Sequence, residues 1–216
     1  MPEGRHRSSA RPYLLVALLA AIVLGVVGFL ALARGGTDLL SRATPEFSFR
    51  IARATGTSGT PGTKDRELAD AAMAAAEKVE PVLSTFYASA FLDPENLSDA
   101  AYDEAWEAFD AAALPDARAA IETLTLGDLG PAFSDVQPAD GVLRARVFFD
   151  AYGEPALLAA NVVFTATATP GGEAAAPATI VSRGEFLLRE SGGLWRIVAF
   201  RVDRADEDLP AATAAG

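Results

Sequence analysis

The residue types that most often perform catalysis or hold metals are nearly missing from this chain. Its 216 residues include no cysteine and a single histidine, His6, which stands between two arginines near the N-terminus. Cysteine nucleophiles, thiolate metal sites and disulfides are therefore excluded, and the remainder of the chain has no imidazole to serve as a base or ligand. Glycine-rich phosphate loops and nucleophile elbows are also missing. Only carboxylates and hydroxyls remain for chemistry.

The acidic residues do not have the spacing of a metal site. Asp203, Asp206, Glu207 and Asp208 gather near the C-terminus without the fixed intervals of a calcium loop. We interpret residues 206–216 as a disordered, solvated tail. The sequence therefore predicts no catalytic, cofactor-binding or metal-binding residue, and no cofactor.

An apolar segment near the N-terminus is the first element that would position the rest. Residues 13–33 form a run of 21 without a charge, which as a helix spans about 31 Å, the thickness of a hydrocarbon core. Three arginines precede the run, so residues 1–12 should stay in the cytoplasm and the remainder should lie outside. A cleaved signal peptide is the alternative, because Ala31-Leu32-Ala33 has the form of a cleavage site. We expect an uncleaved single-pass anchor in the cytoplasmic membrane, contacting the lipid bilayer through residues 13–33.

Within this segment, Ala17, Ala21 and Gly25 form a stripe of small residues at intervals of four. Such stripes let two membrane helices approach closely, so they predict a homo-oligomer through the anchor. The alternative is that alanine and glycine are simply common in membrane helices.

Residues 34–64 have the composition of a flexible spacer. The stretch TGTSGTPGT from Thr55 is polar and rich in chain breakers. Within the spacer, Phe47, Phe49 and Ile51 alternate with polar residues, which is typical of a short strand over 47–51. A disordered stalk remains the alternative there.

The charge balance excludes nucleic acid as a partner. After residue 34 the chain has fourteen basic and twenty-eight acidic residues, a net charge of −14. Nucleic-acid binding needs a basic surface that displaces counterions from phosphates, and this region has the opposite sign.

Residues 65–205 have the patterns of one folded domain. A helical spacing of apolar residues begins at Asp65, and Pro81 should kink or break that helix. A second helix is expected from Ser98, and a third from Leu114-Pro115-Asp116. After a turn-rich segment from Gly127, four apolar runs with short connections predict antiparallel strands. They are residues 142–150, 157–169, 179–190 and 194–203. Helices followed by a strand meander give an α+β fold of about three helices on a curled antiparallel sheet of about four strands.

This element order, ending in Gly192-Gly193-Leu194-Trp195-Arg196-Ile197-Val198, resembles the nuclear transport factor 2-like superfamily. The resemblance implies a cone-shaped domain. With the anchor and spacer, the chain is similar to actinobacterial mammalian-cell-entry-associated membrane proteins. It also resembles scaffold subunits of conjugation and type IV secretion machines.

Enzymes of the similar superfamily use a pocket carboxylate as base and a tyrosine as oxyanion donor. The resemblance implies Asp150, Tyr152 and Tyr102 for such roles, but abundant surface acids make an ordinary solvated aspartate the better interpretation. The expectation is a non-catalytic accessory or scaffold subunit of a cell-envelope transport or secretion complex. Its extracytoplasmic domain would act through contacts with other membrane or envelope proteins. The first alternative is a carrier of a small apolar ligand in the cone, and the second is an enzyme of the isomerase or hydratase type.

Overall fold

The computed structural model describes residues 43–58, 65–171 and 176–207. The predicted cytoplasmic tail and membrane helix, over residues 1–33, lie outside the described residues, as does most of the predicted C-terminal tail. Among the helices that are described, none is long and apolar enough to cross a membrane.

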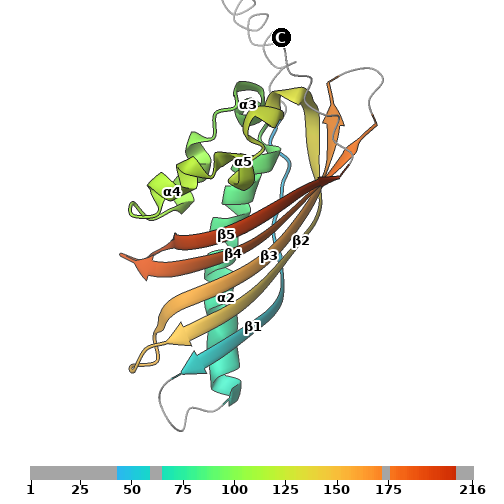
Figure 1. Cartoon of the computed structure of the whole chain (residues 1–216). Coiled ribbons are helices and arrows are strands. Elements are labelled where there is room, and N and C mark those ends of the chain that lie inside the picture. The colour runs from blue at the N-terminus through green and yellow to red at the C-terminus, as the bar shows by residue number, and fades with distance from the viewer. Residues whose placement is uncertain (1–42, 59–64, 172–175, 208–216) are drawn as a thin grey trace, which may run out of the picture. The chain divides into compact units, whose positions relative to one another are not determined.

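A five-stranded mixed sheet forms one layer of the domain, and Figure 1 shows α2 running across one side of it. The strands lie side by side in chain order: β1 (Arg50–Ser58), β2 (Phe133–Phe149), β3 (Pro155–Pro170), β4 (Ala178–Ser191) and β5 (Leu194–Glu207). Strands β2 to β5 form the predicted antiparallel meander, whereas β1 pairs with β2 in parallel. The predicted α+β class is confirmed, whereas the expectation of a wholly antiparallel sheet of about four strands was wrong, because the sheet is mixed and has five strands.

The additional strand comes from the segment predicted to be a spacer. It covers Arg50–Ser58, later than the expected 47–51, and includes the first part of the low-complexity stretch. Phe49, just before it, is 3% exposed and packs in the core. Its N–H donates to Glu80 Oε1 at 2.8 Å and to Ser84 Oγ at 3.0 Å, which fixes the chain against the helical layer. The folded domain thus includes residues that lie before Asp65.

Glycine allows β1 to approach the helix so closely. A Cβ at Gly56 would lie 2.7 Å from the side chain of Leu68 and 2.9 Å from that of Phe149. Gly56, which belongs to a stretch predicted to be flexible, therefore permits close packing between β1 and its neighbours.

Helix α2 (Asp65–Tyr87) buries the predicted face, including Ala72, Val79 and Leu83. It continues through Pro81, so the predicted break does not occur. Pro81 is exposed while the residues around it are anchored in the core, and this packing outweighs the lost backbone hydrogen bond. A π-helical turn, η1 (Ala88–Leu92), follows.

The second helix begins elsewhere than predicted. Asp93, not Ser98, is the N-cap of α3 (Pro94–Asp99), and its carboxylate accepts the N–H groups of Glu95 and Asn96. The predicted apolar face from Tyr102 to Phe109 is buried but belongs to the 3₁₀ helix η2 (Asp103–Ala108). Three short helices complete the layer: α4 (Leu114–Ala119), which starts where predicted, α5 (Ile121–Leu124) and the 3₁₀ helix η3 (Gly127–Ala132).

The segment expected to be turn-rich is partly strand. β2 starts at Phe133, and its first half pairs with the end of β3. Register shifts next to Pro138 accommodate a residue that has no N–H to donate. Along the rest of β2, burial alternates from Gly141 to Phe149, so one sheet face packs against the helices and the other is exposed.

Candidate functional site

The three residues implied by an enzyme-like site are not brought together. Asp150 ends β2, and its Oδ1 accepts the N–H groups of Tyr152 at 2.8 Å and Glu154 at 2.9 Å. It therefore caps a turn. Tyr152, at the tip of that turn, is 92% exposed. Tyr102 is buried beside η3, where its hydroxyl donates to the carbonyl of Gly127 at 3.0 Å. The β2–β3 turn and η3 lie at opposite ends of β2, as Figure 1 shows.

Aromatic rings fill the space between sheet and helices. Tyr87 lies at their centre, with ring centroids 5.4 Å from Phe91, 5.1 Å from Phe164 and 6.2 Å from Phe186. Its hydroxyl is 3.1 Å from Ser182 Oγ, and burial raises the pKa of this phenol well above its ordinary value. A pocket for a small apolar ligand would require this volume, so the rings act as core.

The buried polar groups do not form a catalytic set. In the described residues the buried polar side chains are three serines and a threonine, with no carboxylate: Ser84, Ser89, Thr125 and Ser182. Over the same part of the chain, no group of three His, Cys, Asp or Glu side chains is placed to hold a metal. Trp195 Nε1 is the buried side-chain polar atom there that lacks a hydrogen-bond partner.

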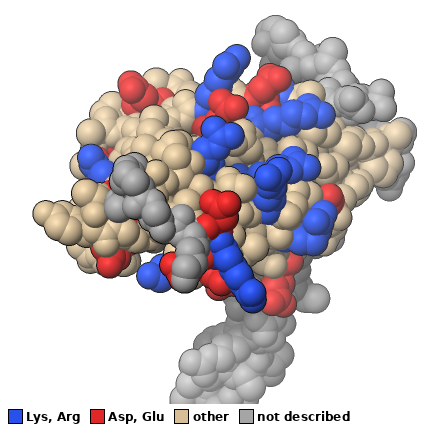
Figure 2. All heavy atoms as spheres, turned by 90° about the horizontal axis from the view of Figure 1, so that it is seen from below, with Lys and Arg blue, Asp and Glu red and all other residues tan. Residues whose placement is uncertain are grey.

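The exposed face of the sheet carries the main concentration of positive charge. One row crosses all five strands through directly paired residues: Arg53, Arg144, Asn161, Glu185 and Arg201. Arg146 follows two residues after Arg144, on the same face, and Arg50 and Arg183 lie in an adjacent row. We call this surface the arginine face. Figure 2 shows basic side chains gathered in a band across one side of the molecule, with a few acidic ones among them.

The arginine face is hollowed between β1 and β3. The hollow has a volume of about 600 Å³, and its charged lining consists of three arginines and one carboxylate: Arg53, Arg144, Arg146 and Glu185. None of these three guanidinium groups makes an ion pair or hydrogen bond with another described residue. Like charges on directly paired residues of neighbouring strands destabilise a sheet, so the pairing of Arg53 with Arg144 is unfavourable for stability.

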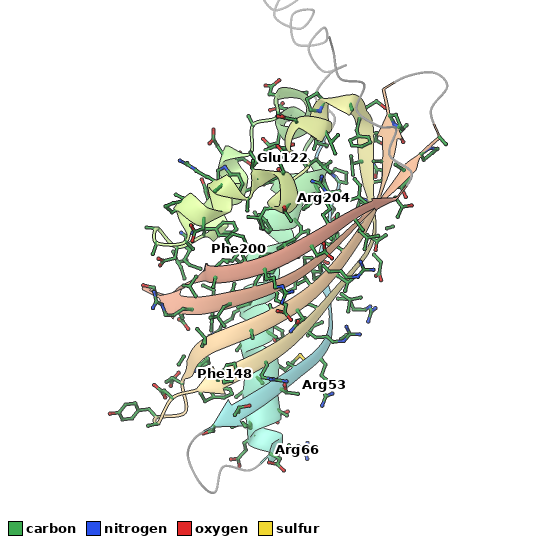
Figure 3. The ribbon with its side chains drawn as sticks, in the orientation of Figure 1. Arg53, Arg66, Glu122, Phe148, Phe200 and Arg204 are labelled. Atoms are coloured by element: carbon green, nitrogen blue, oxygen red, sulfur yellow. The ribbon has the colours of Figure 1, made fainter. Side chains whose placement is uncertain are left out.

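An aromatic side chain borders this hollow. Phe148 on β2 is 36% exposed and lines the hollow, as an apolar residue on the otherwise polar side of that strand. Figure 3 shows Arg53 and Phe148 on β1 and β2, whereas Phe200 and Arg204 of β5 point to the helical side. Arg204 donates to the carbonyl of Thr125 and so has a structural role. Arginine and exposed aromatic side chains together are typical of protein-binding surfaces.

The surface beside α2 has the opposite charge. From Asp65 to Ala132 the chain has fifteen acidic and three basic residues. Three of these carboxylates and Glu46, which precedes β1, line a hollow of about 490 Å³ that has no lysine or arginine in its lining; the three are Glu80, Asp93 and Glu104. We call it the acidic hollow. A neighbouring hollow of about 560 Å³ shares Glu104 and adds Glu107, Trp195 and Arg196. Negative charge is thus concentrated on the helical layer.

Sequence reasoning did not find the arginine face. Arg144 and Arg146 fell within the strand predicted over residues 142–150, where they alternate with apolar residues, and Arg53 fell within the predicted spacer over residues 34–64. The available signal was their alternation with apolar residues. What could not be derived was the parallel pairing of β1 with β2, which places Arg53 directly beside Arg144.

Comparison with known proteins gives no further guide to this site. No family profile, curated protein or solved structure matches the chain.

Proposed function

We propose that this protein is a non-catalytic accessory or scaffold subunit of a cell-envelope complex, active in transport or secretion. Residues 13–33 anchor it in the cytoplasmic membrane as a single pass, with the N-terminus inside and the domain outside. The domain acts through protein contacts, and its binding surface is the arginine face. The observation that carries the proposal is the set of exposed arginines, Arg53, Arg144 and Arg146, that make no ion pair with any acidic side chain of the described part of the chain.

The filled interior supports this function over the two alternatives. A carrier of an apolar ligand needs an enclosed apolar cavity, but the centre of the domain holds Tyr87, Phe91 and Phe164 in contact. An isomerase or hydratase needs a carboxyl group in an apolar site, where burial raises its pKa. The described carboxyl groups are not buried, and Asp150 is occupied in a turn.

The superfamily resemblance belongs to the same proposal. We infer that the sheet is the curled sheet of a cone-shaped domain similar to nuclear transport factor 2. The order of helices first and meander last supports this, as does the hairpin at Gly192-Gly193 before Trp195. This fold hosts both enzymes and assembly modules, so the function rests on the surface and not on the resemblance.

Site-specific photocrosslinking in cells tests the function. A photoreactive amino acid at Thr57, which is exposed on β1 and paired with Phe148, should form covalent adducts with one or a few envelope proteins. The same group at Ala119, exposed on α4, is the matched control position. Arg53→Glu with Arg144→Glu should abolish the Thr57 adducts, whereas Arg118→Glu on α4 should leave them intact. If Thr57 gives no specific adduct, or if the adducts ignore the charge reversal, the arginine face is not the binding surface.

A further inference from the structure

We propose that the arginine face binds the acidic hollow of a second copy of this chain, so that the domains associate head to tail. This deepens the proposed function, on which it rests, by naming the partner of the arginine face. Both complementary surfaces are present on one domain: Arg53, Arg144 and Arg146 on the sheet, and Glu46 and Glu104 beside the helices.

The chemistry of the two surfaces is complementary. Guanidinium groups bind carboxylates through two parallel hydrogen bonds, which gives these pairs defined geometry as well as attraction. Glu46 and Glu104 are exposed, and within the described residues neither makes an ion pair. Glu80 and Asp93 are held in place by hydrogen bonds from Ser84 and from the start of α3, so the hollow is preorganised. Each surface therefore supplies the charges that the other lacks.

A symmetric back-to-back dimer through the sheet is disfavoured by the same charges. Such an interface would bring the row of Arg53, Arg144, Glu185 and Arg201, in which three arginines outnumber one carboxylate, against the same row of the second copy. Juxtaposed like charges cost several kcal/mol in an interface. A head-to-tail contact avoids this cost because each arginine meets a carboxylate.

The negative net charge of the chain opposes association only weakly. At physiological ionic strength the Debye length is about 8 Å, so charges on the far side of each domain are screened while charges in contact are not. Tethering to one membrane also raises the effective concentration, so that a weak contact is sufficient. Because the two binding surfaces differ, a pair of copies keeps one arginine face and one acidic hollow free, and association extends to a ring or a row. Such growth suits a scaffold.

The test uses the full chain, purified in detergent, and exploits the lack of native cysteine. One sample carries Asn161→Cys, exposed in the arginine hollow, and the other carries Ser48→Cys, exposed in the acidic hollow. A bismaleimide should join the two chains when they are mixed. Arg53→Glu with Arg144→Glu on the first chain should reduce the yield about tenfold or more, since each lost contact of about 1.4 kcal/mol is a factor of ten. Arg118→Glu on the first chain should leave the yield unchanged. A higher salt concentration should lower the yield for the pair without charge reversal.

A charge swap separates this contact from general aggregation. When the second chain also carries Glu46→Arg and Glu104→Arg, its crosslink to the charge-reversed first chain should return. The proposal is overturned if mixed chains do not crosslink, if Asn161→Cys chains join mainly to each other, or if the swap fails to restore the product in folded variants. If the photocrosslinking partner of Thr57 in cells is a different protein, the proposed function stands and this inference fails. If Thr57 has no partner, both fail.

Discussion

The indole ring of Trp195 stabilises the fold, whereas its N–H group destabilises it. The ring is 5% exposed, and Nε1 has no partner among the described residues. We expect Trp195→Ala to lower the free energy of unfolding by about 3–5 kcal/mol, because it leaves a cavity. Trp195→Phe should cost less, since it also removes an unpaired buried donor that costs about 1–3 kcal/mol. Urea unfolding measures both. Leu194→Ala, at a neighbour that is 58% exposed, is the control and should change little; an equally small effect of Trp195→Ala would place the ring outside the core.

Tyr102 makes stability depend on alkaline pH. Burial raises the pKa of Tyr102 to about 12, whereas a tyrosine in the unfolded chain ionises near pH 10. The folded state thus keeps a proton that the unfolded state loses, so this contribution is complete below pH 10 and is lost as pH rises towards 12. Tyr87, whose pKa burial also raises, acts in the same direction.

The corresponding variant is Tyr102→Phe. The free energy of unfolding, measured in urea between pH 9 and about 11.5, should fall less steeply with pH than in the parent chain. The difference between the two slopes corresponds to at most one proton released on unfolding. An unchanged slope would show that Tyr102 ionises alike in both states.

At the residue scale the sequence was more informative about what is absent than about the site. The lack of histidine and cysteine beyond His6 is a property of composition, so it could be read directly. The arginine face depends on which strands are neighbours and on their register, because Arg53 and Arg144 are far apart in the chain. A single sequence does not contain that pairing.

Among the elements, β1 is expected to be indispensable to the domain. A fragment of residues 43–207 should unfold cooperatively in urea, because it retains Phe49 and all five strands. A fragment of residues 65–207 lacks β1 and exposes the edge of β2, so it should be less stable by at least the roughly 3–5 kcal/mol of a lost core phenylalanine. Equal urea midpoints for the two fragments would mean that β1 adds little to the stability of the domain.

The long elements were predictable because their patterns are strong and local. The buried face of α2 and the four apolar runs that became β2 to β5 extend over many residues, and both were anticipated. The short elements depended on competing local signals. Asp93 displaced Ser98 as the cap because Pro94 follows it and suits the first helical turn. β1 was anticipated only in part, since its threonines and Gly56 are strand-forming only when α2 packs over them.

For the whole molecule, the charge distribution around the apolar segment predicts topology. Ser191, exposed in the β4–β5 turn, is a suitable labelling position in a chain without cysteine. Ser191→Cys should react with an impermeant thiol reagent in intact cells. The control is Ser8→Cys, which precedes the proposed anchor in the sequence and should react only after lysis. The reverse pattern would contradict a domain outside the membrane.

The parallel pairing of β1 with β2 has a consequence for how the chain acquires its fold. Thr55 and Ala145, which meet across these strands, are 90 residues apart, whereas β2 to β5 follow one another closely in the sequence. Contacts between distant residues require costly loop closure and form late in folding. The ribosome synthesises β1 first, whereas β2, its partner strand, is synthesised long afterwards. During that interval Phe47 and Phe49 have no core to enter. β1 should therefore dock last, and substitutions in it should accelerate unfolding far more than they slow folding.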